Sequence, residues 1–131
     1  MLIVRGRAAA DIPTLEPTST FTGQVWGDPV LPATKEGIAG NVVTFTPGAR
    51  THWHVHPGGQ LLVVTSGLGL VGAADGQVHQ VRAGDLIWTP PGERHWHGGT
   101  ARTVLSHLAI SIGVTEWHAA VTDEEYGIEP F

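Results

Sequence analysis

The 131-residue chain contains no cysteine. This absence excludes disulfide bonds, thiolate zinc sites and thiol nucleophiles, so any bound metal must be held by nitrogen and oxygen. Basic residues are also scarce, with 7 Lys and Arg against 12 Asp and Glu and a formal net charge of -5. A nucleic-acid surface needs clustered positive charge, so no nucleic-acid partner is expected.

Long apolar runs are missing, although hydrophobic residues make up 41% of the chain. No stretch approaches the length of a membrane span, and Met1-Leu-Ile-Val-Arg-Gly-Arg is too short and wrongly ordered for a secretory signal. We therefore expect a cytoplasmic protein with no membrane partner. The length suits a single domain, residues 1–131, with one continuous core.

Glycine and proline are abundant by contrast, and 18 Gly and 9 Pro divide the chain into short segments. This pattern is typical of all-β sandwiches and barrels. We expect an irregular arm over residues 1–20, a β-barrel over 21–121 and a tail over 122–131 that starts with a helical turn capped by Thr122. Within the barrel, Gly27-Asp28-Pro29 predicts a turn, and one strand is expected to end at Gly67 before 68–72 continues the sheet.

Three histidines alternate in the segment that follows Gly48. Alternate side chains of a strand point to one face, so His52, His54 and His56 are expected on the same side. Gln60 follows a Pro-Gly-Gly turn and can return an oxygen to the same place. Such an arrangement of nitrogen and oxygen donors predicts a metal site.

A second cluster contains His95 and His97, and His107 stands alone in a later predicted strand. Histidines on a strand can also be plain polar residues on a solvated face, and we interpret His79 and His118 in this way. Six of the 8 histidines nevertheless fall in the two clusters or at position 107. This convergence favours a metal site over a solvated face.

These residues resemble the two motifs of the cupin superfamily. The first motif asks for Gly, five residues, His-x-His, three or four residues, an acid, six residues and Gly. Its spacing is met by Gly48, His54, His56, Gln60 and Gly67, with glutamine in the place of the acid. The resemblance implies an all-β fold, the cupin-type double-stranded β-helix, which is a jelly-roll barrel of two antiparallel sheets.

The second motif asks for Gly, five residues, Pro-x-Gly, two residues and His. Gly84, Pro90, Gly92 and His95 satisfy it, whereas the asparagine that the family has four residues later is Gly99 here. The resemblance implies that the metal ligands are His54, His56, Gln60 and His95. His52 has no counterpart among the family's ligands and is expected at the rim of the pocket or as a further donor.

A narrower resemblance covers most of the chain from Phe21 onward. It is carried by Pro-Gly-Ala-Arg-Thr, Trp-His-x-His-Pro-x-Gly-Gln and Gly-Glu-x-His-Trp-His-Gly. Small single-domain cupins with these segments include manganese-dependent hydroxynitrile lyases. The resemblance implies a divalent metal ion, Mn ahead of Fe, Ni or Zn. It also implies a pocket for a small molecule, to which it assigns Asn41, Val43, His97, His107 and Ser111.

We therefore expect a lyase of the hydroxynitrile-lyase type, with the metal as Lewis acid and His107 or His97 as the base. Because Gln60 is neutral, it leaves the cation a stronger Lewis acid than a glutamate would. The alternatives are a quercetinase-like dioxygenase, a polyketide-type cyclase or isomerase, and a non-catalytic cupin that binds a metal or metabolite. The arm and the exposed sheet edges favour a homo-oligomer, either a dimer or a tetramer.

Two further expectations concern side-chain direction and charge. Trp53 and Trp96 alternate with the histidines, so they should point away from the metal into the opposite packing layer. His107 shares its strand face with Leu105 and Ala109. Burial disfavours an imidazolium ion, so His107 is expected to be neutral at pH 7.

Overall fold

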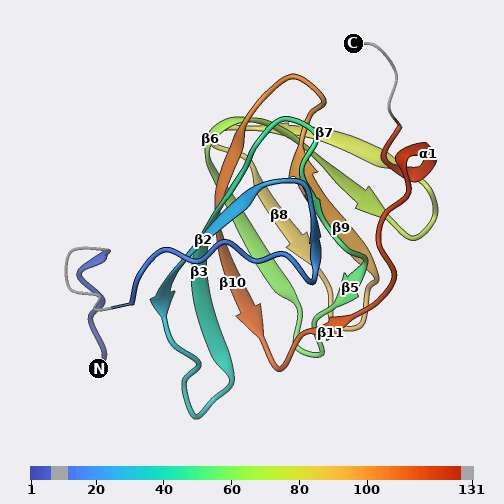
Figure 1. The fold of residues 1–131 in the computed structure, drawn as a ribbon. Helices are drawn as coiled ribbons and strands as arrows, with labels where there is room; N and C mark the ends of the chain where they lie inside the picture. Colours follow the sequence, from blue (N-terminus) through green and yellow to red (C-terminus); the bar gives the residue numbers. More distant parts are fainter. Residues whose placement is uncertain (7–11, 128–131) are drawn as a thin grey trace.

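β-strands are the main secondary structure in the computed structural model, which describes residues 1–6 and 12–127 (Figure 1). The expectations for residues 7–11 of the arm and 128–131 of the tail lie outside the described residues. No helix in the described part of the chain is long and apolar enough to cross a membrane. With many strands and one helix of four residues, the described part of the chain is nearly all-β, as the sequence predicts.

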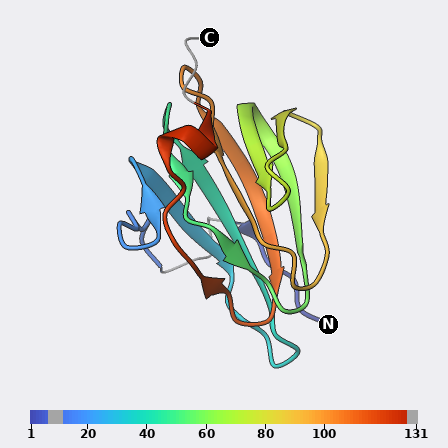
Figure 2. The same cartoon turned by 90° about the vertical axis from the view of Figure 1, so that its right-hand side faces the viewer.

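Within residues 1–6 and 12–127, eleven strands and one short helix follow one another. They are β1 (Phe21–Thr22), β2 (Val25–Leu31), β3 (Ile38–Phe45), β4 (Arg50–Thr51), β5 (His54–Val55), β6 (Gln60–Ala73), β7 (Val78–Arg82), β8 (Leu86–Thr89), β9 (His95–Gly99), β10 (Leu105–Ile112), β11 (Glu116–Trp117) and α1 (Asp123–Tyr126). The strands pair antiparallel throughout and make two facing layers, seen from the side in Figure 2. One layer contains β2, β3, β10, β8 and the first half of β6, and the other contains β1, β4, β9, β7, β5, β11 and the second half of β6.

The long strand β6 joins the two layers. Its first half pairs with β8 and β10, and its second half pairs with β7 and β9. The crossing point is Gly67, whose φ of 83° favours glycine and whose Cβ, if present, would clash with the carbonyl of Val104. The sequence predicted that a strand ends here. Instead glycine turns the backbone sharply within one continuous strand.

The predicted turn at Gly27-Asp28-Pro29 is wrong, because these residues lie inside β2. Gly27 is opposite Val43 and Pro29 is opposite Asn41 in the antiparallel pair with β3. Proline is tolerated because β2 is at the end of the strand order, where a missing N–H costs no central hydrogen bond. A register shift between Pro29 and Leu31 follows directly.

The apolar residues form two clusters, one on each side of the layer that contains β9. The cluster between the layers consists of Val25, Phe45, Ala49, Val64, Val71, Val81 and Leu105. The other consists of Trp53, Leu70, Trp96, Val121 and Tyr126. Trp53 and Trp96 therefore pack away from the neighbouring histidines, which confirms the expected alternation on β9.

Helix α1 covers the second cluster and begins as the sequence predicts. Thr122 accepts a hydrogen bond from the Glu125 backbone N–H, and the Glu125 carboxylate accepts one from the Thr122 backbone N–H. Arg50 on β4 donates to the Val121 carbonyl and contacts Asp123 at 2.8 Å. These contacts tie the C-terminal segment to the strand that precedes the histidines.

Candidate metal site

The histidine segment is two short strands rather than one. β4 ends at Thr51 and β5 begins at His54, with a bend at Trp53 between them. Thr51 and His54 both line a cavity although they are three residues apart, so the alternation of a continuous strand is broken. His52 is half-buried and is not among the lining residues. This corrects the expectation that three histidines share one face and that His52 reaches the pocket.

Pairing between strands brings three imidazoles together. His54 on β5 is directly opposite His95 on β9, and their ring centroids are 4.3 Å apart. The ring of His56 lies 4.9 Å from that of His54 and 5.4 Å from that of His95. All three side chains are buried. Two segments about 40 residues apart in the chain, both anticipated from the motifs, thus meet at one point.

Backbone carbonyls orient two of these rings. His54 Nδ1 lies 2.9 Å from the His52 carbonyl oxygen, and His95 Nδ1 lies 3.1 Å from the Glu93 carbonyl oxygen. A carbonyl can only accept, so in the tautomer whose Nδ1 donates to this carbonyl each neutral ring keeps a lone pair on Nε2. Burial lowers the pKa of both imidazoles and so favours these neutral forms.

Gln60, at the start of β6, adds an oxygen to the group. Its Nε2 donates to Ser111 Oγ at 3.1 Å, and its Oε1 lies 2.9 Å from His95 Nε2. In the His95 tautomer that donates Nδ1–H to the Glu93 carbonyl, both of these close atoms present lone pairs, and a cation beside them would satisfy both. His56 Nε2 is also buried without a hydrogen-bond partner. Neutral imidazole nitrogens and an amide oxygen are donors that could hold a divalent cation.

His97 lies beside the same group. His54, His95 and His97 each offer one ring nitrogen as a ligand atom. These three nitrogens lie within 4.8 Å of one another, so the three histidines could hold a metal ion. This group shares His54 and His95 with the set that the motifs imply. The site therefore offers two candidates for the third imidazole, His56 and His97.

His107 lies behind His97 rather than in the cavity. Its Nε2 is 2.9 Å from His97 Nδ1, it packs against Phe45, and it is fully buried. Burial lowers the pKa of His107 to about 4, so the ring is neutral at pH 7 as expected. His97 lines the cavity, whereas His107 is not among the lining residues. The expected direct contact between His107 and a substrate is therefore corrected: His107 reaches the cavity only through His97.

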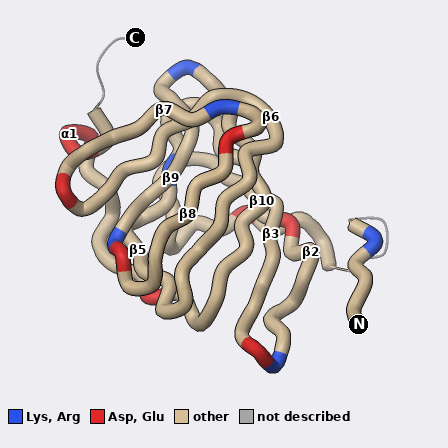
Figure 3. Tube along the Cα trace, turned by 180° about the vertical axis from the view of Figure 1, so that it is seen from behind, with Lys and Arg blue, Asp and Glu red and all other residues tan. Residues whose placement is uncertain are grey.

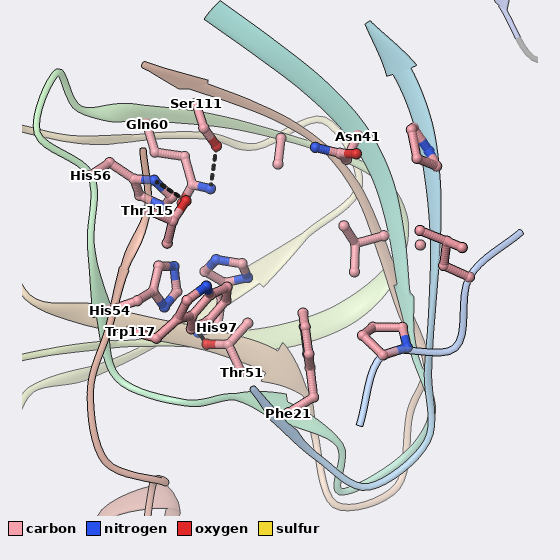
Figure 4. Close-up of a pocket in the computed structure, with 16 residues that line it drawn as sticks. Phe21, Asn41, Thr51, His54, His56, Gln60, His97, Ser111, Thr115 and Trp117 are labelled. Carbon is pink, nitrogen blue, oxygen red and sulfur yellow. Dashed lines mark hydrogen bonds between the residues drawn. The ribbon is translucent and has the colours of Figure 1, made fainter. Parts of the chain in front are cut away.

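Three of the imidazoles, those of His54, His56 and His97, line a cavity of about 210 Å³, whereas His95 is not among its lining residues (Figure 4). In the close-up, His54, His56, Gln60 and His97 gather on one side, and Asn41 lies across from them. Other polar lining residues are Thr51, Ser111 and Thr115, and the larger apolar ones are Leu15, Pro17, Phe21, Pro29, Val43 and Trp117. A cavity of this size, mostly apolar with a few polar groups, suits a small organic molecule.

Some residues that line the cavity belong to no motif that can be recognised in the sequence. Leu15 exchanges two backbone hydrogen bonds of 2.8 Å with Gly27, which places Leu15 and Pro17 of the expected irregular arm at the cavity. Thr51 joins the lining only because the strand bends before His54. Both contributions depend on contacts between distant segments, so the spacing of residues along the chain does not reveal them.

Comparisons with known proteins identify similar sequences and folds. The model of the cupin domain family matches residues 41–111. A curated (R)-mandelonitrile lyase from Granulicella tundricola is 45% identical over 115 residues, which cover 84% of this chain and 88% of that protein. The crystal structure of a cupin-like protein from Thermotoga maritima is 39% identical with a TM-score of 0.81, covering 85% of this chain and 89% of that one. A polyketide cyclase from Streptomyces resistomycificus shares the fold at 16% identity and a TM-score of 0.73, covering 96% and 91%.

Proposed function

Because the chain belongs to the cupin family, we propose that it is a metal-dependent lyase that cleaves a small hydroxynitrile. The observation that carries this proposal is the similarity to (R)-mandelonitrile lyase over most of both chains. The cavity supports it, because apolar side chains such as Phe21 and Trp117 can hold the organic group of a substrate whose hydroxyl faces the imidazoles. The dioxygenase, cyclase and binding-only alternatives have no comparable support, since the cyclase neighbour is similar in fold alone.

In this proposal, His54, His56, Gln60 and His95 hold a divalent ion, with Mn as the favoured metal. Gln60 lies close to both His95 and His56, so its oxygen and the two rings can converge on one point. His56 is preferred to His97 as the third imidazole because His56 lies near Gln60, whose oxygen also approaches His95. Once bound, the ion would supply Lewis-acid chemistry that makes a substrate hydroxyl more acidic.

The base in this proposal is His97. Its Nε2 is buried without a hydrogen-bond partner, and the side chain lines the cavity. When His97 Nδ1 donates to His107 Nε2, the lone pair of His97 Nε2 is free to accept a proton. The proton would pass from the substrate hydroxyl to His97, the carbonyl would form, and the C–C electron pair would leave with cyanide. Return of that proton to cyanide would release hydrogen cyanide and restore neutral His97.

A His97→Ala variant tests these assignments. The purified variant should keep its metal, as measured by elemental analysis, and cleave mandelonitrile with a kcat lower by at least roughly a hundredfold. The matched control is His79→Ala, because His79 is an exposed histidine on β7. Loss of metal from His97→Ala would make His97 a ligand. A metal-loaded wild-type protein that cleaves no cyanohydrin, or that consumes O₂ during turnover, would contradict the lyase.

A further inference from the structure

The N-terminal segment extends one layer of the barrel beyond β2. Leu15 is opposite Gly27 in an isolated antiparallel bridge with two backbone hydrogen bonds of 2.8 Å. Gly27 is in turn opposite Val43 on β3, and Val43 is opposite His107 on β10. Residues that are directly paired across a sheet point to the same face. Leu15, Val43 and His107 therefore stand in one row, with Gly27 between the first two.

Gly27 leaves a gap in this row because it has no side chain. Its φ lies outside the left-handed region that favours glycine, and a Cβ added there would meet no atom within 4 Å. Neither the backbone conformation nor close packing therefore requires glycine at this position. Gly27 lines the cavity together with Leu15 and Val43, so the gap belongs to the cavity. Because neighbouring strands are about 4.8 Å apart, the backbones of Leu15 and Val43 are about 10 Å apart across this gap.

This end of the cavity lies away from the imidazoles. Figure 4 shows the N-terminal segment, in blue, and β2 on the side opposite His54 and His56. Pro17 of that segment and Pro29 of β2 also line the cavity. Asn41 is opposite Pro29 and is the polar neighbour of these residues. No Asp, Glu, Lys or Arg is among the described residues that line the cavity, so this end is apolar with one amide beside it.

Charged residues on β2 and in the connection that follows it lie outside the cavity. Asp28 is between Gly27 and Pro29, so the alternation of the strand directs it to the outer face. There Thr14 donates a hydrogen bond to its carboxylate. Figure 3 views the molecule from behind and shows further charged residues at the turn between β2 and β3. A charged group at this end of the cavity would find no partner, so the occupant must be uncharged.

We propose that this end of the cavity is a distal subsite for the apolar end of the substrate, formed by Leu15, Pro17, Gly27, Pro29 and Val43. The inference rests on the proposed function, in which the hydroxyl at the other end of the substrate faces the imidazoles. It adds the substrate class, which is hydroxynitriles with an extended apolar group, such as an aryl ring on a short alkyl chain. The chain passes Val43 into the gap above Gly27, and the ring packs on Leu15.

Aromatic contacts near the imidazoles explain why the apolar group is extended. Trp117 packs against His54 with ring centroids 4.8 Å apart, and Phe21 packs against Trp117 at 5.7 Å. A ring attached directly to the reacting carbon would contact these aromatic residues and leave the gap above Gly27 empty. An extended group reaches Leu15 and so removes more apolar surface from water. Leu15 is 49% exposed and marks the outer limit of the subsite.

A Gly27→Leu variant tests the subsite by filling it. Isothermal titration of the Mn²⁺-loaded protein with benzyl alcohol and with 3-phenyl-1-propanol measures binding without requiring turnover. Each buried methylene raises affinity about fourfold, so the wild type should bind the longer alcohol about tenfold more tightly. Gly27→Leu should remove this preference and leave the Kd of benzyl alcohol nearly unchanged. Leu15→Ala should weaken the preference, whereas the control Leu2→Ala should keep it, because Leu2 is 68% exposed and is not among the lining residues.

Turnover provides a second measurement. In Gly27→Leu, kcat/KM for the cyanohydrin of 3-phenylpropanal should fall by about tenfold, while kcat/KM for mandelonitrile stays near the wild-type value. Equal affinity of the wild type for the two alcohols, or an unchanged preference in both Gly27→Leu and Leu15→Ala, would overturn the subsite. A wild-type protein that prefers the longer alcohol but cleaves no cyanohydrin would support the subsite and contradict the lyase alone, so the two failures are distinguishable.

Discussion

The orientation of one amide group decides what Gln60 presents to His95. In the structure, Ser111 Oγ accepts a hydrogen bond from Gln60 Nε2, which leaves the amide oxygen next to His95 Nε2. The opposite orientation would offer an N–H instead, and an N–H cannot bind a cation. Ser111 therefore positions a candidate ligand, in addition to lining the cavity.

Replacing Ser111 by Ala should weaken metal binding without abolishing it. Removing a residue that orients a ligand typically lowers metal affinity by about 10- to 100-fold. Isothermal titration of the metal-free protein with Mn²⁺ measures the effect. Ser106→Ala is the control, because Ser106 lies on the same strand but its hydroxyl pairs with Thr44 on the outer side. An unchanged Kd for Ser111→Ala would show that the serine does not orient Gln60.

The passage of β6 from one layer to the other depends on Gly67. This residue combines a φ of 83° with direct contact to the Val104 carbonyl, so both the backbone and the neighbouring chain require glycine. Gly76 in the β6–β7 hairpin has a similar φ of 87°, but a Cβ there would meet open space. The two glycines therefore separate the cost of the backbone conformation from the cost of the clash.

Gly67→Ala should destabilise the protein much more than Gly76→Ala. At Gly76 we expect a loss of about 1 kcal/mol in the free energy of unfolding, from the left-handed backbone alone. At Gly67 the clash should add about 1–3 kcal/mol, since β10 must move away from β6. Urea unfolding of both variants measures the difference. Equal losses would mean that the crossing tolerates a side chain.

The barrel as a whole buries five histidines in neutral form. Burial lowers the pKa of His54, His56, His95, His97 and His107, and for His56 and His107 it lowers the pKa to about 4 from 6.5. Below pH 6.5 the unfolded chain therefore binds protons that the folded chain does not. The contribution of these histidines to the stability of the metal-free protein is then fully present above pH 6.5 and falls as the pH drops toward 4.

We accordingly expect the urea midpoint of the metal-free protein to fall steeply between pH 6.5 and 4. His107 alone accounts for a loss on the order of 3 kcal/mol, which is a large part of the stability of an ordinary domain. A His107→Gln variant should show a shallower dependence on pH because it has one buried imidazole fewer. A midpoint that stays constant over this range would contradict the neutral buried cluster.

Much of the fold and part of the site could be predicted from the sequence because they rest on local patterns. Glycine and proline divide the chain into short strands, and Thr122 with Glu125 forms the predicted capping box. The spacing of the two motifs anticipated that His54, His56 and Gln60 would meet His95. The capping box depends on neighbours along the chain, which the sequence displays directly, whereas the meeting of the two distant segments was implied by the resemblance to the cupin motifs.

Tertiary structure alone decided which of the remaining histidines reach the cavity. The bend at Trp53 turns His52 away, and the packing of β9 against β10 puts His107 behind His97. The pairing of Leu15 with Gly27 brings the N-terminal arm to the cavity. Each of these outcomes follows from contacts between segments far apart in the chain, whose geometry depends on the whole barrel rather than on the residues at either end.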